Sequence, residues 1–387
     1  MKNIRLFALS LVASIGLSTA LYGGDMYVKS GNTGASSPYD SWATAAANIA
    51  DAVAIAADGT TIHVAPGTYT MAAEVGPVAV TNAIRIVGEG KTPEDVIVRR
   101  TVRASNAHKY CALFHIDNKD AFVANLVMHH GSTTQPTGDT TAGSAWIGSN
   151  GGCISNCVVR DGYASHPYDR TPGILIMGPG LVTHCVITNN TCSSGLEPAT
   201  WGNSDVAAAV VMKGAGSRLE NCLIRDNRGA SEASSGTGVE KLSVIYATSS
   251  SSIVNCTIIT NKARKCAGVY ANGTGVTVKN CVMAGNVDVG ITPNNPNWMG
   301  TGNFVACATD DATPINSNCY TGTVAKFFRD YDHGDYRPKA PGPLVNKCVS
   351  YEGMPAIDLG GNKRLIGSKV DIGCYEANAA EFCIRVR

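Results

Sequence analysis

The sequence predicts an all-β solenoid with a capping helix at its N-terminal end. Three observations point to this fold class. A nine-residue motif recurs along the middle of the chain, its apolar residues alternate with a period of two, and Asn or Gly stands at fixed places beside them. A constant motif at variable spacing is typical of solenoids, in which each repeat is one coil and loops of different length are inserted at one place.

The motif centres on a cysteine. Five segments align without gaps, and a sixth has Leu126 in the place of the cysteine. They are "VANLVMHHG" from Val123, "ISNCVVRDG" from Ile154, "VTHCVITNN" from Val182, "LENCLIRDN" from Leu219, "IVNCTIITN" from Ile253 and "VKNCVMAGN" from Val278. The central residues are 25 to 37 residues apart, and an apolar residue follows each of them two places later. This periodicity favours strands over helices.

Each motif is expected to lie between two bends. Gly and Asn tolerate left-handed backbone, and they are enriched directly before the central residue and five places after it. The residues before it are Asn125, Asn156, His184, Asn221, Asn255 and Asn280. The residues after it are Gly131, Gly162, Asn190, Asn227, Asn261 and Asn286. A second strand is predicted ahead of each motif, beginning at Gly173, Ala209, Ser243 and Gly268.

The cysteines allow two interpretations. The motif cysteines share one inward position, so they are expected to form a reduced stack of small buried side chains. These are Cys157, Cys185, Cys222, Cys256 and Cys281. Outside the stack, an exported chain could form disulfides. The candidates are Cys153, Cys192, Cys266, Cys307, Cys319, Cys348, Cys374 and Cys383.

An outward-facing row of mostly aliphatic residues follows the central residues. The row reads Val127, Val158, Val186, Leu223, Thr257 and Val282. An exposed apolar stripe would be a partner surface. The alternative, which we favour from the sequence, is the preference of β-branched residues for strands.

The ends of the chain have distinct roles. Lys2 and Arg5 precede an apolar stretch at 6–17, which predicts a cleaved signal peptide over residues 1–20 and a secreted or cell-surface protein. No segment is apolar for long enough to span a membrane. Residues 21–60 are expected to form the cap, 61–305 the coils and 306–387 a closing segment.

The predicted capping helix has one apolar face. That face comprises Trp42, Ile49, Val53 and Ala56. Ser41 is the expected N-cap and Gly59 the expected terminator. Such a helix would cover the apolar end of the first coil.

Charge excludes one class of partner. The 387 residues carry 31 Lys and Arg against 30 Asp and Glu, a net charge of +1. A nucleic-acid-binding protein would need a broad basic surface, so no such partner is expected. We expect a monomer.

At its motifs and at both ends, the chain resembles the right-handed parallel β-helix proteins of the pectate-lyase-like superfamily. The N-terminal runs "MYVKSGNTG" and "SWATAAANIADAVAIAADGTTIHVAPGTY" are similar to the opening of secreted β-helix proteins. The runs "DYRPKAPGPLVN" and "AIDLGGNKRLIGSKVDIGCYE" are similar to the closing segment of bacterial surface β-helix proteins. The resemblance implies a right-handed parallel β-helix fold and a carbohydrate-related function. The calcium and arginine motifs of pectate lyases do not occur.

Long loops in consecutive coils are expected to form a wall along one side of the solenoid. Aromatic and charged side chains in these loops suit a polysaccharide, because sugar faces stack on rings and hydroxyls or carboxylates pair with charges. The predicted substrate-binding residues are Trp146, His166, Tyr168, Asp169, Arg170, Glu197 and Trp201.

Three functions remain open from the sequence. The first, which we favour, is polysaccharide binding as a surface or structural module without catalysis. The second is a polysaccharide lyase in which Lys213, Arg225 or Arg228 removes the proton beside a uronate carboxylate that another cation or Ca²⁺ neutralises. The third is a glycoside hydrolase with paired carboxylates such as Asp169 and Glu197. No metal ligands can be chosen from the spacing.

Overall fold

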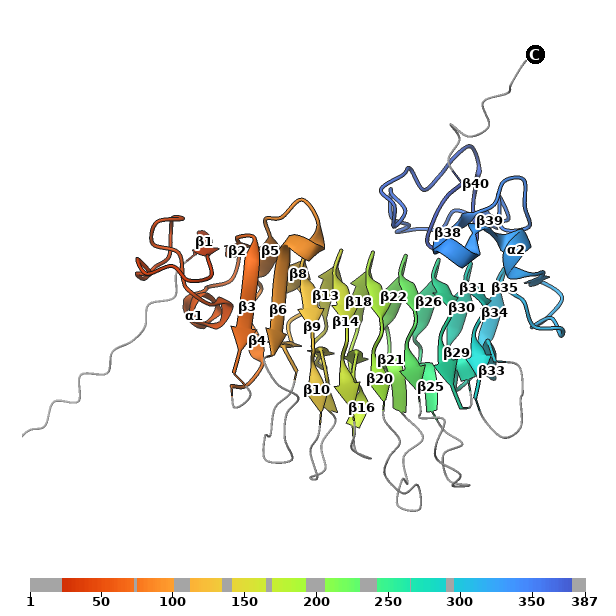
Figure 1. Ribbon diagram of the computed structural model, residues 1–387, viewed down its shortest axis with the longest axis horizontal. Helices are drawn as coiled ribbons and strands as arrows, with labels where there is room; N and C mark the ends of the chain where they lie inside the picture. Colours follow the sequence, from red (N-terminus) through yellow and green to blue (C-terminus); the bar gives the residue numbers. More distant parts are fainter. Residues whose placement is uncertain are drawn as a thin grey trace, which may run out of the picture.

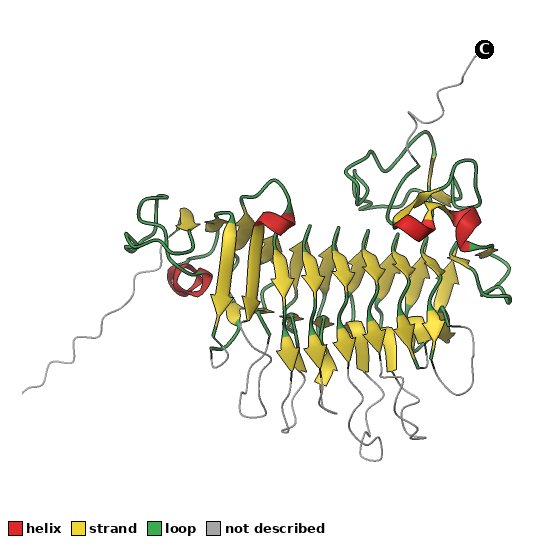
Figure 2. Cartoon of the chain, in the orientation of Figure 1, coloured by secondary structure: helices red, strands yellow, loops and turns green. Residues whose placement is uncertain are grey.

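The computed structural model describes residues 23–72, 75–100, 112–133, 141–164, 169–192, 206–229, 242–264, 266–289 and 296–377. Strands stack side by side along the long axis of the molecule, and the few helices lie at the ends and edges of the stack (Figure 1, Figure 2). Each regular coil contributes one strand to each of four parallel sheets, which are numbered below in the order in which the chain visits them. Among the described residues, no helix is long and apolar enough to cross a bilayer.

The first and second sheets each contain ten strands. In stacking order, the first sheet comprises β1 (Asp25–Val28), β2 (Thr61–Val64), β5 (Arg85–Gly88), β8 (Phe122–Ala124), β13 (Gly152–Ser155), β18 (Gly180–Thr183), β22 (Arg218–Glu220), β26 (Ser252–Val254), β30 (Thr277–Lys279) and β34 (Asn303–Val305). The second comprises β3 (Gly67–Met71), β6 (Val96–Arg100), β9 (Val127–His129), β14 (Val158–Arg160), β19 (Val186–Thr188), β23 (Leu223–Arg225), β27 (Thr257–Ile259), β31 (Val282–Ala284), β35 (Ala308–Thr309) and β36 (Tyr320–Thr321).

The third sheet has six short strands and the fourth has eight. The third comprises β10 (Ser132–Thr133), β15 (Tyr163–Ala164), β20 (Thr191–Cys192), β24 (Arg228–Gly229), β28 (Lys262–Ala263) and β32 (Val287–Asp288). The fourth comprises β4 (Val78–Val80), β7 (Phe114–Ile116), β12 (Ala145–Ile147), β17 (Ile174–Ile176), β21 (Val206–Met212), β25 (Leu242–Ala247), β29 (Cys266–Ala271) and β33 (Trp298–Gly300). A small separate pair joins β11 (Thr141–Ala142) to β16 (Asp169–Thr171).

The core is built from rows of apolar side chains that repeat from coil to coil. In the first sheet, Ile154, Val182 and Leu219 occupy one register position, and all three are fully buried. Strand alternation sends every second residue inward, so one position per strand is enough to line the core. Each buried aliphatic side chain contributes about 1.5–3 kcal/mol relative to exposure. The predicted period-two pattern is confirmed.

The bend between the first and second sheets lies where the sequence predicted it. Asn125, Asn156, His184, Asn221, Asn255 and Asn280 all have φ between 47° and 57°. The second predicted bend is wrong by one residue. Left-handed backbone occurs instead at His130, Asp161, Asn189, Asp226, Thr260 and Gly285.

The asparagines after the second bend have a different function. Asn190, Asn227 and Asn261 are buried, and each backbone N–H donates to the side-chain oxygen of the next asparagine at 2.9–3.0 Å. Asn286 accepts the last of these bonds. Buried polar backbone groups at a bend need partners, and this ladder of amides supplies them.

The cysteine stack is present and longer than predicted. The five motif cysteines are buried free thiols, and Cys307 continues the row after Ala306, whose φ is 50°. The expectation of disulfides at some other cysteines is wrong, because those thiols are also free. They are Cys153, Cys307, Cys319, Cys348 and Cys374. Cys192 and Cys266 are buried in β20 and β29, and Cys383 lies outside the described residues.

The N-terminal helix is shorter than predicted. Helix α1 spans Ile49–Ile55, and its N-cap is Asn48, whose side-chain oxygen accepts from the backbone of Asp51 at 2.9 Å. Asn48 donates in return to the carboxylate of Asp51 at 2.7 Å, so this pair sets the start of the helix in place of Ser41. Trp42 precedes the helix and packs on Tyr27.

The C-terminal segment, residues 306–377, folds back over the second sheet near the end of the stack (Figure 1). It contains helix α2 (Val324–Phe327) and two antiparallel pairs. These are β37 (Phe328–Asp330) with β38 (Asp335–Pro338), and β39 (Cys348–Val349) with β40 (Lys369–Val370). Among the described residues, 3-10 helices span Pro93–Asp95 and Tyr331–His333.

This segment accounts for part of the outward aliphatic row. Leu223 and Val282 are buried in one cluster with Phe327, Phe328 and Ile372. Thr257 is also buried, and its hydroxyl accepts from the backbone of Cys374 at 3.1 Å. Here the partner of the row is therefore the chain's own C-terminal segment.

Candidate functional site

The outer face of the fourth sheet carries a row of aromatic and aliphatic side chains. In register from β7 to β29, the row reads His115, Trp146, Leu175, Val211, Tyr246 and Tyr270. The flanking residues on these strands, such as Ala145 and Ile147, belong to the main core. Alternation therefore places the row on the opposite side of the sheet. We call it the aromatic row.

Two pairs of rings lie near the ends of this row. The rings of His115 and Trp146 stack, with centroids 4.0 Å apart and planes 13° apart. Tyr246 and Tyr270 meet edge to face at 5.3 Å, and Asn272 donates to the Tyr246 hydroxyl at 2.6 Å. His115, Trp146 and Tyr270 are half-buried. Burial lowers the pKa of His115 below its ordinary value, although Asp117 acts in the opposite direction.

Lys213 lies beside the aromatic row. It directly follows β21, in which Val211 belongs to the outer cluster and Met212 to the core, so alternation puts Lys213 on the outer side. Its backbone is held on both sides: its N–H donates to Ile176 at 2.8 Å and its carbonyl accepts from the Ser249 hydroxyl at 3.0 Å. Of the predicted residues, Trp146 and Lys213 therefore share one face.

The two predicted arginines lie elsewhere. Arg225 ends β23 in the second sheet and forms an ion pair with Asp226. Arg228 begins β24 in the third sheet, where it is in register with Thr191 and Lys262. The structure thus separates the three candidate bases over three sheets.

The other predicted binding residues fall largely outside the described part of the chain. His166, Tyr168, Glu197 and Trp201 lie outside the described residues. Asp169 and Arg170 belong to β16, but the description does not extend to their side chains. The loop wall and the carboxylate pair for a hydrolase therefore remain predictions.

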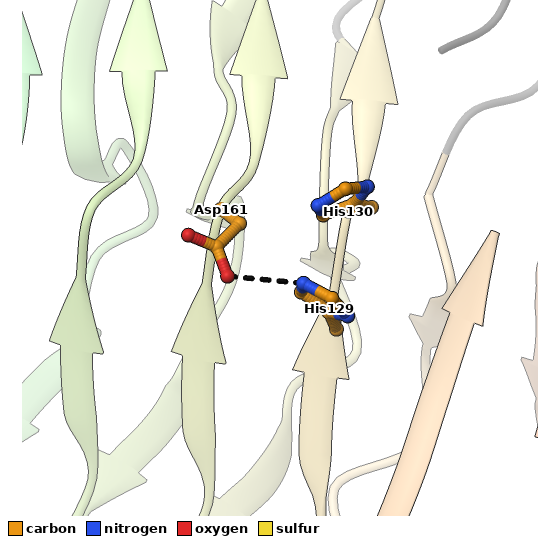
Figure 3. Close-up of side chains that lie close together, drawn as sticks. All are labelled: His129, His130 and Asp161. Atoms are coloured by element: carbon orange, nitrogen blue, oxygen red, sulfur yellow. Dashed lines mark ion pairs between the residues drawn. The ribbon is translucent and has the colours of Figure 1, made fainter. Parts of the chain in front are cut away.

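A second cluster of polar side chains lies at the bend after the second sheet (Figure 3). His129, His130 and Asp161 have ligand atoms that all lie within 4.8 Å of one another. His129 Nε2 is 3.0 Å from Asp161 Oδ2, and the two imidazole centroids are 4.0 Å apart. Burial and then the neighbouring His130 lower the pKa of His129, against the attraction of Asp161.

An open cavity of about 270 Å³ adjoins this cluster. It is lined by His130, Gly131, Asp161, Gly162, Tyr163, Asn189 and Thr191. The cluster therefore borders both solvent and a space large enough for a small ligand.

The described residues offer no cluster that fits the Ca²⁺ of the lyase hypothesis. Ca²⁺ takes six to eight oxygen ligands. Within the described ranges, the His129, His130 and Asp161 cluster is the only group of three or more His, Cys, Asp or Glu side chains that could hold an ion. It offers two nitrogens and one carboxylate, which is a poor ligand set for Ca²⁺.

Sequence reasoning missed most of the aromatic row. The strands that carry Tyr246 and Tyr270 were predicted, and counting alternate positions along them would have placed both tyrosines outward. His115 comes before the first recognised motif and had no such signal. His129, His130 and Asp161 are visible in the sequence as a polar stripe, but their approach depends on the register between coils.

Residues 114–297 match the family described as right handed beta helix region. Together with the stacked parallel sheets, this match shows that the chain folds as a right-handed parallel β-helix, as the sequence predicted.

One solved structure supports the fold, and two others are similar at a lower score. The crystal structure of pectate lyase Pel9A superposes with a TM-score of 0.51 at 14% identity, covering 93% of this chain and 98% of that one. A pectin methylesterase from Aspergillus niger has a TM-score of 0.39 at 14% identity and covers 79% of this chain and 91% of its own. A rhamnogalacturonan lyase has a TM-score of 0.35 at 12% identity, with 78% and 66% covered. No curated protein sequence matches the chain.

Proposed function

We propose that this chain is an exported protein that binds a polysaccharide on the outer face of the fourth sheet. The observation that carries the proposal is the aromatic row, with its half-buried His115, Trp146 and Tyr270 and with Lys213 beside it. The β-helix fold is compatible with this role, but a fold alone does not define a reaction.

The chemistry of the row suits an acidic glycan. The apolar faces of sugar rings stack on aromatic side chains. The half-buried rings offer such contacts at the two ends of the row, His115 with Trp146 at one end and Tyr270 at the other, whereas Leu175, Val211 and Tyr246 between them are buried. Lys213 offers a cation for a uronate carboxylate. Because the net charge is only +1, recognition must depend on such local contacts rather than on long-range attraction.

A second function, a lyase acting on uronate-containing glycans, is favoured by the position of Lys213. Its amine would take the proton beside the uronate carboxylate, a carbon–carbon double bond would form, and the bond to the leaving sugar oxygen would break. Among the three predicted bases, only Lys213 is close in register to the aromatic row. Arg225 and Arg228 would act at another surface.

Retention on immobilised polysaccharides tests the binding proposal. Trp146→Ala should weaken retention on a uronate-containing glycan by about two- to tenfold, since an aromatic contact contributes about 0.5–1.5 kcal/mol. Trp42→Ala is the matched control, because Trp42 is 43% exposed and packs near the N-terminus. Melting temperatures establish that both variants are folded. Equal retention of the two variants would contradict the proposal.

The same polysaccharides distinguish binding from catalysis. Unsaturated-uronide absorbance that grows together with new reducing ends would establish a lyase, and Lys213→Ala should then abolish both signals. Retention without either signal supports binding alone. Reducing ends without the absorbance would point to a hydrolase and against Lys213 as base.

A further inference from the structure

The cluster at His129, His130 and Asp161 has a geometry that repeats nowhere else along the described part of the stack. His130 and Asp161 occupy the same bend in successive coils, with φ of 58° and 59°. Residues at equivalent positions in neighbouring coils are about 4.8 Å apart. In later coils this bend carries Asn189, Asp226 and Thr260, none of which is a histidine. At this bend, only one pair of the described coils thus brings two imidazoles and a carboxylate together.

The donor set selects a class of cation. Two imidazole nitrogens and one carboxylate oxygen suit borderline divalent metals such as Zn²⁺, whereas Ca²⁺ and Mg²⁺ prefer oxygen alone. His129 and Asp161 are 19% and 22% exposed, and His130 is exposed, so an ion can reach all three from solvent. Three protein ligands with an open fourth position are typical of zinc sites that also bind water or a substrate.

Neighbouring groups hold the carboxylate in place. Asn189 donates to Asp161 Oδ1, which orients the carboxylate towards the histidines. Arg160 Nη1 lies 3.6 Å from Asp161 Oδ2, but the other terminal nitrogen of Arg160 pairs with Glu94 at 3.0 Å. Glu94 therefore offsets part of the positive charge beside the cluster.

We propose that His129, His130 and Asp161 bind one divalent transition-metal ion of the Zn²⁺ class, with its open coordination position facing the adjoining cavity. The cavity of about 270 Å³ includes Tyr163 and Thr191 in its lining, so a small ligand on the ion would meet polar side chains there. This site is on the bend between the second and third sheets, away from the aromatic row, and it does not depend on the proposed polysaccharide binding.

Metal titration of the full chain without a polyhistidine tag tests the proposal. The probes are Zn²⁺ in calorimetry and Co²⁺ in visible absorption. One ion per chain is expected, with Co²⁺ bands of nitrogen and oxygen coordination. Failure of the unmodified chain to take up either ion would overturn the proposal.

The coil that contains β19, next to the coil of Asp161, suggests conservative variants. It carries Thr188 and Asn189 at the positions equivalent to His129 and His130. His129→Thr, His130→Asn and Asp161→Asn introduce these residue types, so the backbone bend is kept. Either histidine variant should weaken binding by at least about 100-fold, and Asn189→Ala, which removes only the orienting contact, by about tenfold. Circular dichroism confirms folding.

Two control variants make the test specific. Asp226→Asn changes a bend carboxylate that has Asn189 and Thr260 at the equivalent positions of the neighbouring coils, and His333→Gln changes an exposed histidine paired with Asp330. Both should bind as the unmodified chain does. Unchanged affinity in His130→Asn would overturn the site, as would a Co²⁺ thiolate charge-transfer band, because it would assign the ion to cysteines instead.

Discussion

Single asparagines perform two different tasks within one coil. Asn221 supplies left-handed backbone at φ 52°, whereas Asn227, six residues later, is an interior hydrogen-bonding group. The sequence predicted both as bend residues, because composition shows only that asparagine recurs. The two roles differ in the direction of the side chain. That direction cannot be predicted by counting alternate residues, because the period-two alternation is interrupted at each bend.

The interior role can be tested at Asn227. Its amide donates to the carbonyls of Ile187 at 2.9 Å and Arg225 at 3.0 Å, and its oxygen accepts from the backbone of Asn190. Asn227→Ala should lower the free energy of unfolding by about 3 kcal/mol, because each buried group left without a partner costs about 1–3 kcal/mol. Urea denaturation measures the loss. The exposed Asn303→Ala should cost less than about 0.5 kcal/mol, and equal losses would refute the ladder's role.

At the scale of elements, the C-terminal segment is attached through both apolar and polar contacts. Val370 and Ile372 pack with Leu223 and Val282, and the backbone of Gly373 donates to Asn280 at 2.9 Å. The Tyr351 hydroxyl donates to Glu220 at 2.6 Å. From the sequence this region was expected only to close the stack, since nothing in the local pattern indicates which distant face it covers.

Weakening the apolar contact should release this segment alone. Ile372→Ala removes a fully packed side chain and should cost about 2–4 kcal/mol. Limited proteolysis followed by mass spectrometry should show cleavage within residues 306–377 while the coils stay intact. Ile366→Ala is the control in the same segment, because Ile366 is 36% exposed. Cleavage first within the coils would contradict this docking arrangement.

The same segment contains a buried charge cluster. Arg364 lies 3.2 Å from Glu376, and Asp358 and Asp371 are close enough to influence the same carboxyl. Glu376 and Asp371 both lie near the single Arg364 guanidinium, and Asp358 adds a further negative charge near Glu376. Burial raises the pKa of Glu376 to about 8, although Arg364 acts to lower it.

This raised pKa predicts the direction of a pH effect. A carboxyl whose pKa is higher in the folded state than in the unfolded state stabilises the folded state when it is protonated. For Glu376, this stabilisation is complete below the pKa of the unfolded state and is lost as the pH rises through about 8. The C-terminal segment should therefore exchange amide hydrogens faster at pH 9 than at pH 6, relative to the intrinsic rates. Glu376→Gln should remove most of the difference. An unaltered pH response in that variant would exclude Glu376 as its source.

At the scale of the whole molecule, the stacked motif cysteines are free thiols that solvent does not reach. Cys157, Cys222 and Cys281 are buried free thiols, and burial raises the pKa of each above its ordinary value. Burial also raises the pKa of the Cys374 thiol to about 12. Thiolates are the reactive form, so the folded protein should resist thiol reagents.

Thiol titration measures this directly. At least the five motif cysteines should react in denaturant, and few thiols should react in the native protein. Fewer than five reactive thiols after denaturation would contradict the reduced stack. The comparison needs no variant, because the folded and unfolded states of one sample serve as each other's control.

The fold was predictable and the candidate site largely was not, for one physical reason. Coil stacking depends on a local pattern that repeats, so Cys185 or Ile187 can be placed inward from the sequence alone. A site on the outside of a solenoid depends on which residues of different coils come into register. The separation of Lys213 from Arg225 and Arg228 follows from the sheets that carry them, not from their spacing in the chain.

The C-terminal segment also makes the two ends of the solenoid unequal in stability. In a simple solenoid each coil contacts only its neighbours, and either end can fray independently. This segment crosses several coils at once, from Leu223 to Val282, and makes their stabilities interdependent. The coils that carry Leu223 to Val282 cannot open one at a time while the C-terminal segment is docked on them. Unfolding is therefore expected to begin at the other end, where β1 and β2 form the outermost pair of the stack.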